Sequence, residues 1–481
     1  MNNVTYQDSA PEQHSRRTLL KRAVAGGTLA LGFGALDGLV RAAHATDRVS
    51  TTVGLGDGGY GELRPVIRTD PVTGYRQELL LPHGFDFALF GLAGTTMDDG
   101  HVTPLGHDGM AAYRGPHGSY RLVRNHEERT GSGQVSPSGD AADRYDGSGG
   151  GGTSTLQVSV RSGQVEVERV WTSLAGTIVN CAGGPTPWGS WLSCEETTAG
   201  TRHAGWERDH GYVFEVDSRA DRPVEPKPLP ALGRFVHEAV AVDHRTGIVY
   251  LTEDRGTAGF YRFVPARRGD LTLGKLQMLA VADAAGYDTR TGQSQGAELP
   301  IEWVDIDDPD PRDAETDPLA VYRQGHARGG ATFARLEGCW WGGQAVYLVS
   351  TNGGDVGEGQ IWEYRPHPGG RDGGTLSLVY ESFDRAVMSF PDNITVSPRG
   401  TLLVCEDTSR SDPQLIGVTG EGSTFPFCVD PTDDEWCGAT FSHDGRVLFA
   451  NLQGSTSGSP LAPETPGRTV AIWGPWQRGA L

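Results

Sequence analysis

Hydrophobic residues along this chain fall in short runs that are rich in Val, Leu, Tyr, Phe and Trp, and many of them alternate with polar residues. Gly, Pro, Asn and Asp separate the runs, which is typical of strands joined by tight turns. From residue 46 onward, no amphipathic helical pattern is longer than two turns. The pattern predicts an all-β protein.

Several of these runs repeat one layout: a strand, a turn that ends in glycine, and a second strand that closes on polar residues. The copies are residues 181–196, 238–254, 393–407 and 437–452, with turn glycines Gly189, Gly247, Gly400 and Gly445, and looser copies at 118–127 and 343–354. The last two glycines are 45 residues apart (445 − 400), close to the length of a propeller blade. We expect residues 46–481 to form a single β-propeller domain of roughly six blades. A meander sandwich is the alternative.

Side chains that can bind metals collect at the open ends of these hairpins. The second strands end in Glu195-Glu196, Glu253-Asp254, Glu406-Asp407 and Asn451-Leu452, and the first strands begin near Cys181, Glu238, Asn393 and Cys437. The start of the first strand in an antiparallel hairpin lies opposite the end of the second, so each hairpin pairs two such side chains. Blades around an axis would bring all of these ends to one mouth of the central channel.

Carboxylates gathered in this way repel one another unless a positive charge lies among them, so the arrangement predicts a metal cluster at that mouth. Oxygen ligands in this number suit Ca²⁺, and a thiolate among them suits iron or zinc. Zinc is the less apt of the two because no closely spaced His and Cys residues occur. Acidic pairs at strand ends that face solvent are the alternative explanation.

The composition agrees with a turn-dense protein that attracts cations. Gly 69 and Pro 29 make up about a fifth of the 481 residues. Asp+Glu 61 against Lys+Arg 41 gives a net charge of −20, which disfavours binding to nucleic acid and to anionic membranes. The six cysteines have neither CxxC spacing nor the density of a disulfide scaffold.

The first 45 residues have the features of an export signal. Arg16-Arg17 precede a short uncharged segment, residues 23–36, and Ala43-His44-Ala45 resembles a cleavage site. This is the twin-arginine form of signal, and its apolar segment is too short to span a membrane. We therefore expect export by the twin-arginine machinery to the periplasm, the cell surface or the medium. The alternative is a basic segment before a buried helix.

Four segments carry a resemblance to a known family: residues 180–196 (NCAGGPTPWGSWLSCEE), 211–217 (GYVFEVD), 233–243 (GRFVHEAVAVD) and 392–407 (DNITVSPRGTLLVCED). They closely resemble the PhoX-type alkaline phosphatases, and the resemblance extends from about residue 109 to residue 453. It implies a twin-arginine-exported β-propeller around a cluster of Fe³⁺ and Ca²⁺ ions.

The resemblance also implies roles for individual residues. Cys181 would bridge two iron ions, and Glu196 and Glu238 would bind iron. In the segment 333–337 (FARLE), Arg335 would bind the transferred phosphoryl group and Glu337 would bind iron, with Leu336 where the family has proline. The calcium ligands would come from Asn125, Glu127, Glu195, Glu253, Asp254, Glu406 and Asp407.

These features together predict a metal-dependent phosphomonoesterase that acts on small phosphate esters as a monomer. No Gly-x-Ser-x-Gly elbow occurs, which favours an oxygen nucleophile held by metal over a serine. A calcium lactonase or phosphotriesterase on the same fold is a second hypothesis, but it leaves Cys181 unused. A calcium-stabilised binding propeller without phosphatase activity is the third.

Overall fold

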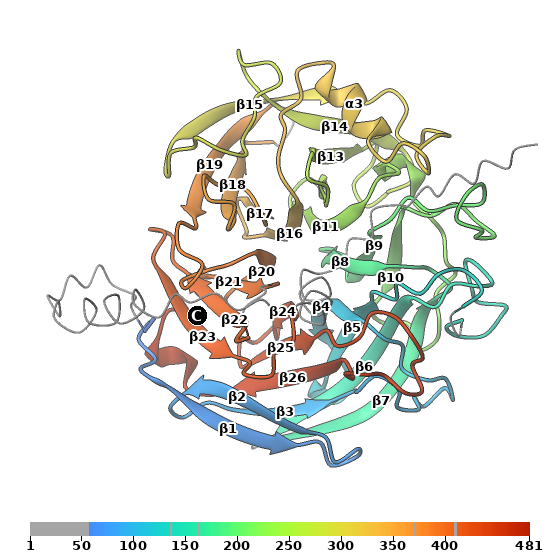
Figure 1. The fold of residues 1–481 in the computed structure, drawn as a ribbon, viewed down its shortest axis with the longest axis vertical. Coiled ribbons are helices and arrows are strands. Elements are labelled where there is room, and N and C mark those ends of the chain that lie inside the picture. Colours follow the sequence, from blue (N-terminus) through green and yellow to red (C-terminus); the bar gives the residue numbers. More distant parts are fainter. Residues whose placement is uncertain (1–56, 135–136, 162, 370–371, 408–410) are drawn as a thin grey trace, which may run out of the picture. The chain divides into compact units, whose positions relative to one another are not determined.

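Residues 57–134, 137–161, 163–369, 372–407 and 411–481 are described by a computed structural model of the chain. The expected export signal, residues 1–45, lies outside the described residues. Within the unit Gly56–Leu481, antiparallel sheets form blades around a centre (Figure 1). The all-β propeller expected from the sequence is confirmed, and a sandwich is excluded.

Each blade is a meander whose first strand is the innermost. Blade 1 contains β4 (His107–Arg114), β5 (Tyr120–His126), β6 (Gly152–Arg161) and β7 (Gln164–Ala175). Blade 2 contains β8 (Asn180–Pro185), β9 (Ser190–Glu195) and β10 (Val213–Asp217). Blade 3 contains β11 (His237–Val242), β12 (Val249–Glu253), β13 (Phe260–Pro265) and β14 (Gly274–Val281).

The second half of the ring follows the same plan. Blade 4 contains β16 (Leu336–Trp341), β17 (Val346–Ser350), β18 (Gln360–Pro366) and β19 (Gly374–Glu381). Blade 5 contains β20 (Pro391–Val396), β21 (Leu402–Glu406), β22 (Gln414–Val418) and β23 (Thr424–Val429), extended by β2 (Arg76–Pro82) and β1 (Leu63–Thr69). Blade 6 contains β24 (Trp436–Phe441), β25 (Val447–Leu452), β26 (Arg468–Trp473) and β3 (Asp86–Phe90).

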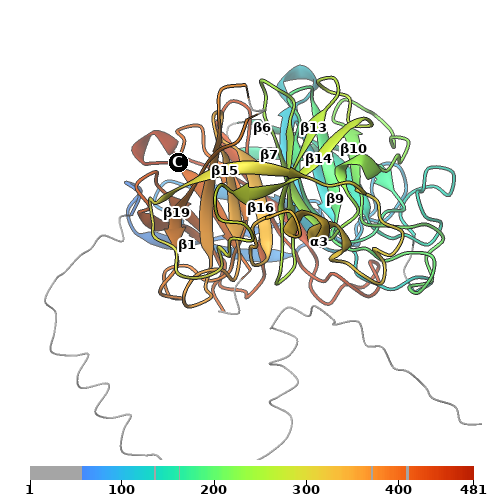
Figure 2. The same cartoon turned by 90° about the horizontal axis from the view of Figure 1, so that it is seen from above.

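Elements outside the blades are few in the described ranges. β15 (Glu298–Asp305) pairs with both β14 and β19 and so links blades 3 and 4 (Figure 2). One short α-helix, α3 (Ala320–His326), and 3-10 turns at Pro116–Gly118, Pro230–Leu232 and Trp476–Arg478 complete the described elements. None of the described helices is long and apolar enough to cross a membrane.

The six innermost strands close a ring, because β4, β8, β11, β16, β20 and β24 contact one another in that order and β24 contacts β4. The ring is joined across the chain ends, since the N-terminal strand β3 completes blade 6 by pairing with β26. Tyr60 adds a second link, because its hydroxyl accepts a hydrogen bond from the backbone N–H of Leu481 at 2.9 Å.

Apolar side chains fill the space between neighbouring blades. The described residues form six buried clusters, one for each blade-to-blade interface. Trp191 and Phe214 lie between blades 1 and 2, for example, and Tyr250 and Trp362 lie between blades 3 and 4. Cys194 is fully buried in the cluster between blades 2 and 3. Burial of both faces of each sheet fixes the angular position of every inner strand.

Candidate metal centre

The first two strands of each blade form its inner hairpin, and all six inner hairpins share one register at their open end. The first residue of the inner strand pairs with the last residue of the next strand, as in Asn180↔Glu195 and His237↔Glu253. The register then shifts by one, so that two residues of the inner strand stand opposite one residue of its partner. Such a bulge turns a side chain out of the regular alternation, and bulges are frequent beside active sites.

The bulge brings one ligand-type residue per blade to the same place in the ring. The second residues of the inner strands are Asp108, Cys181, Glu238, Glu337, Asp392 and Cys437. The first five belong to groups that could hold a metal ion. Cys437 differs because it still pairs regularly with Asn451, and its Sγ lies 2.9 Å from the backbone oxygen of His107, to which the thiol donates.

Residues that directly follow the second strands form a second layer. They are Glu127, Glu196, Asp254, Thr351, Asp407 and Gln453. Glu127, Glu196 and Asp407 join the possible metal-binding groups. Gln453 donates to Glu127 at 2.8 Å and to Asp108 at 3.1 Å, so it holds two carboxylates in place.

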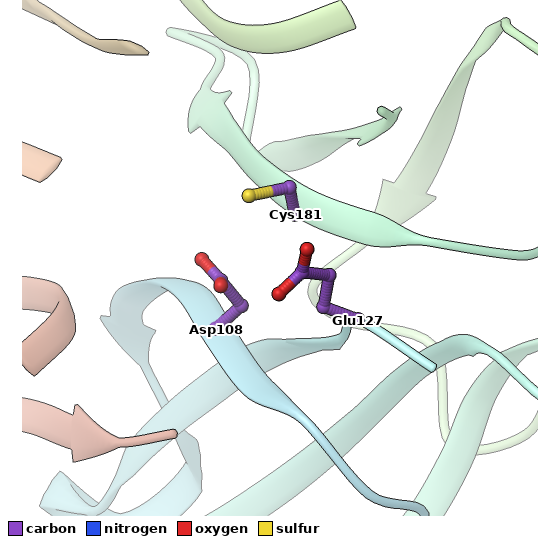
Figure 3. A group of neighbouring side chains, drawn as sticks. All are labelled: Asp108, Glu127 and Cys181. Carbon is purple, nitrogen blue, oxygen red and sulfur yellow. The ribbon is translucent and has the colours of Figure 1, made fainter. Parts of the chain in front are cut away.

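The two layers, together with Glu435 directly before β24, produce four groups whose ligand atoms lie within 4.8 Å of one another. They are Asp108, Glu127 and Cys181 (Figure 3); Cys181, Glu196 and Glu238; Glu238, Glu337 and Asp392; and Asp392, Asp407 and Glu435. Cys181, Glu238 and Asp392 each belong to two groups. Shared ligands of this kind suit neighbouring metal ions, because one carboxylate or thiolate can bridge two of them.

Burial makes this cluster unfavourable in its charged form. It raises the pKa of Asp108, Glu238 and the Cys181 thiol well above their ordinary values, and nearby carboxylates raise them further. The pKa of Asp392 is raised to about 7, first by burial and then by Asp407. Bound cations would reverse this effect, because they stabilise the ionised forms.

The donor set fits metal ions. In the described part of the chain, the buried Oε2 of Glu238 has no hydrogen-bond partner, while its Oε1 lies 3.2 Å from the thiol of Cys181. A buried carboxylate oxygen without a donor is costly unless a cation binds it. Eight carboxylates with one thiol also match the mixture of hard and soft ligands expected from the sequence.

Two arginines lie beside the acidic groups. Arg335 donates to Asp254 through Nε at 2.9 Å and through Nη2 at 3.1 Å, and it forms an ion pair with Glu337. Arg129 forms ion pairs with Glu127 and Glu196. The two arginine side chains are 30% and 33% exposed, whereas their acidic partners are buried. Solutes at the mouth can therefore reach both guanidinium groups.

The backbone before the inner strand has a positive φ in four of the described blades, and it is strained in the three where the residue is not glycine. The residue that precedes the strand has a positive φ at Gly106 (55°), Val179 (48°), Arg335 (45°) and Phe390 (51°). Glycine adopts this conformation freely, but the β-branched Val179 does not. Each strained residue costs about 1–3 kcal/mol, and such residues persist where the surrounding structure fixes them, often at functional sites.

Five of the residues expected to bind calcium, Asn125, Glu195, Glu253, Asp254 and Glu406, lie outside the four groups. Glu195 accepts hydrogen bonds from the backbone N–H groups of Ile178 and Gly211, and its Oε1 lies 2.6 Å from Nδ1 of His210. Burial lowers the pKa of His210, but the charge of Glu195 and hydrogen bonds with Asp146 and Glu195 outweigh it and raise the pKa to about 9. Glu195 therefore has a structural role.

Glu253 and Glu406 occupy the same repeat position as Glu195 and have comparable roles. Glu253 Oε2 accepts hydrogen bonds from the Gly259 N–H at 2.9 Å and from the Tyr261 hydroxyl at 2.8 Å. Glu406 accepts one from the Ser389 N–H at 2.7 Å. Neighbouring residues on a strand point to opposite sides, so the first member of each acidic pair turns into the blade.

Asn125 is also engaged by the protein itself. Its side-chain nitrogen donates to the backbone oxygens of Cys181 and Ala182, and its Oδ1 accepts from the Trp191 indole and the Ser193 hydroxyl. It supports the strand that carries Cys181. Asp254, another expected calcium ligand, pairs with Arg335 and lies outside the four groups.

Sequence reasoning missed Asp108, Asp392 and Glu435 as members of the groups, and it missed Arg129. Asp392 directly precedes Asn393, near which the sequence pattern predicts the start of the strand; Asn393 instead accepts a hydrogen bond from the Gly438 N–H at 2.7 Å. The looser copy at 118–127 contains the second strand of blade 1. The inner strand of the same blade begins at His107, directly before Asp108, so the layout of the repeat could have revealed Asp108.

Comparison with solved structures gives one close likeness in fold. The chain is similar to "Pseudomonas fluorescens PhoX in complex with vanadate, a transition state analogue", with a TM-score of 0.66 and 19% identity, and the match covers 87% of this chain and 98% of that chain. At this identity the likeness establishes the fold. A gluconolactonase from Xanthomonas campestris, XC5397, matches with a TM-score of only 0.36 and 13% identity over 86% of this chain and 98% of that chain, which supports no further conclusion.

Comparison of the sequence with models of protein families shows which family the chain belongs to. A search of curated protein sequences gave no match. The family model described as alkaline phosphatase PhoX, in contrast, matches residues 67–456, well over half of the chain. That range contains every residue of the four groups and both arginines at the mouth. The chain therefore belongs to the alkaline phosphatase PhoX family.

Proposed function

We propose that this protein is a metal-dependent phosphomonoesterase that releases phosphate from small phosphate esters. The observation that carries the proposal is the continuous series of metal-binding groups, with Arg129 and Arg335 beside it. Membership of the alkaline phosphatase PhoX family supports a phosphatase. The solved relative from Pseudomonas fluorescens was captured with vanadate, described there as a transition state analogue, which agrees with phosphoryl chemistry at such a site.

We assign iron to Cys181 and three carboxylates, because a thiolate favours a transition metal over calcium. Its ligands would be Cys181, Glu196, Glu238 and Glu337. Calcium would bind the remaining carboxylates of the series, which are Asp108, Glu127, Asp392, Asp407 and Glu435. When bound, these ions would provide the positive charge that draws in a phosphate ester and would activate an oxygen nucleophile.

Arg335 is the residue that we assign to the phosphoryl group. Its bidentate pairing with Asp254 fixes the guanidinium plane, and the partly exposed side chain faces the mouth. A planar guanidinium can donate two parallel hydrogen bonds to phosphoryl oxygens. Asp254 would then position Arg335, and its carboxylate would keep the arginine in place when no ester is bound.

We also propose that residues 1–45 direct export by the twin-arginine machinery, because Arg16-Arg17 precede a short uncharged segment. Lysine at both arginine positions should retain the protein in the cytoplasm, whereas Arg22→Lys, a change at a neighbouring basic residue, should not. Fractionation of expressing cells followed by immunoblotting provides the measurement. Unchanged export of the double variant would contradict this route.

Replacement of Cys181 by serine should remove iron and activity together. The variant should still fold, because the interfaces between blades are unchanged, and its iron affinity should fall at least about tenfold. Elemental analysis with circular dichroism provides the test. Cys437→Ser is the matched control: it changes the same position of another inner strand, where a hydroxyl can replace the thiol as donor to His107. Full iron content in Cys181→Ser would exclude a thiolate ligand.

Adjacent residues Glu195 and Glu196 should respond differently to replacement by glutamine. Glu196→Gln should lose metal while the metal-free protein keeps its stability. Glu195→Gln should keep metal per folded molecule but should lower the free energy of unfolding by about 1.5–3 kcal/mol, because a buried charged hydrogen bond to His210 is lost. Elemental analysis and denaturant unfolding distinguish the two. If Glu195→Gln lost metal and Glu196→Gln lost stability instead, Glu195 rather than Glu196 would be the metal ligand.

Arg335→Ala should lower the turnover of phosphate monoesters by about 10²–10³ without loss of metal, because the side chain supplies no metal ligand. Arg335→Lys should recover little, since one ammonium group cannot form the bidentate contact. Arg290→Ala is the control. Arg290 forms an ion pair with Asp288 at 2.7 Å, and neither residue belongs to the four groups. The measurements are steady-state kinetics and elemental analysis. Loss of metal in Arg335→Ala would contradict the assignment.

A further inference from the structure

A polar cavity of about 590 Å³ lies beside the metal centre. The residue stretch after β5 forms one wall, with Arg129, Thr130 and Gln134, and the stretch after β25 forms the other, with Ser457 and Ser459; three glycines complete the lining. The volume is within the range of about 300–1,000 Å³ found for small-molecule sites. The cavity therefore has room for the organic part of a phosphate ester.

The two walls are hydrogen-bonded to each other. The backbone N–H of Arg129 donates to the oxygen of Thr456 at 2.7 Å, and the N–H of Gly458 donates to the Thr130 hydroxyl at 3.1 Å. The Thr130 hydroxyl in turn pairs with Glu128, which is buried. These contacts hold the two stretches together at the junction of blades 1 and 6.

Arg129 connects the cavity to the metal centre. Its guanidinium contacts Glu127 and Glu196, which belong to the first two metal-binding groups, and the same side chain lines the cavity. An ester whose phosphoryl group lies at these groups can therefore place its alcohol portion in the cavity. Arg335, by comparison, pairs with Asp254 and Glu337, which belong to other blades.

The chemistry of the lining selects the kind of alcohol. The lining side chains offer hydroxyl, amide and guanidinium groups, and none of the lining residues is aromatic or aliphatic. The charge of Arg129 is balanced by Glu127 and Glu196, so the cavity has no unpaired positive charge to bind a second anionic group of the substrate. Polar walls of this kind hydrogen-bond hydroxyl groups and gain little from an aromatic ring.

We infer that this cavity is the leaving-group site of the enzyme and that it takes neutral, hydroxyl-rich alcohols, as in sugar and polyol phosphates, in preference to aromatic ones. The inference rests on the phosphomonoesterase activity proposed above. Gln134 is the specificity-determining residue in this assignment, because its amide can both donate to and accept from substrate hydroxyls.

The test uses the metal-loaded enzyme with glucose 6-phosphate and phenyl phosphate. Gln134→Leu keeps the size of the side chain but removes the amide, so kcat/KM for glucose 6-phosphate should fall about tenfold relative to kcat/KM for phenyl phosphate. Gln164→Leu, a change at an exposed glutamine at the start of β7, should leave that ratio within about twofold of the unaltered enzyme. A second readout is independent of turnover: saturation-transfer NMR should show contact between free glucose and the protein, and Gln134→Leu should weaken it.

The outcomes distinguish failure of the leaving-group site from failure of the proposed phosphomonoesterase activity. If both esters are hydrolysed and Gln134→Leu leaves their ratio and the glucose contact unchanged, the leaving-group site is wrong while the phosphomonoesterase proposal stands. If the metal-loaded enzyme hydrolyses neither ester, the proposed activity fails and the leaving-group assignment fails with it, even where glucose still contacts the protein. A fall in the ratio together with a weaker glucose contact supports the site.

Discussion

Repulsion among buried acidic groups is the constraint on which the rest of this structure depends. Asp108, Glu238 and Asp392 come from three different blades, yet they lie in overlapping groups where burial opposes their ionisation. Such a cluster cannot assemble by itself, because each charge disfavours the next. The closed ring and the packed interfaces between blades provide the free energy that holds it together, and bound cations would relieve the repulsion.

The repeated bulge shows how a regular fold produces an irregular site. A regular hairpin would place alternate residues on the two faces of the sheet in an unbroken series. The extra residue in each inner strand turns residues such as Cys181 and Glu337 toward the groups, while Glu195 and its equivalents turn into the blades and bind backbone N–H groups. One repeat therefore supplies both the metal-binding side chains and the contacts that support them.

The two arginines explain how a protein with a net charge of −20 can accept an anionic ester. Both are partly exposed at the mouth and balanced by buried carboxylates, so each has a fixed position without a substrate. Arg335 follows the buried Ala334 and adopts a strained backbone conformation before β16. Arg129 borders the polar cavity. In the proposals made above, Arg335 would act on the phosphoryl group and Arg129 would border the site of the alcohol.

The sequence by itself determined the all-β propeller, since strand alternation, turn glycines and the hairpin repeat are local properties of the chain. It also indicated Cys181, Glu196, Glu238 and Glu337 through the family resemblance, and all four lie in the groups that could hold a metal ion. Only the tertiary structure decided which member of each acidic pair faces the mouth. The reason is that neighbouring residues of a strand point to opposite sides, so the answer depends on which face of the strand packs into the blade, and no local sequence pattern marks that face. Asp108 and Arg129 likewise became part of the centre only where blade 1 packs against blade 2, and Glu435 only where blade 6 packs against blade 5.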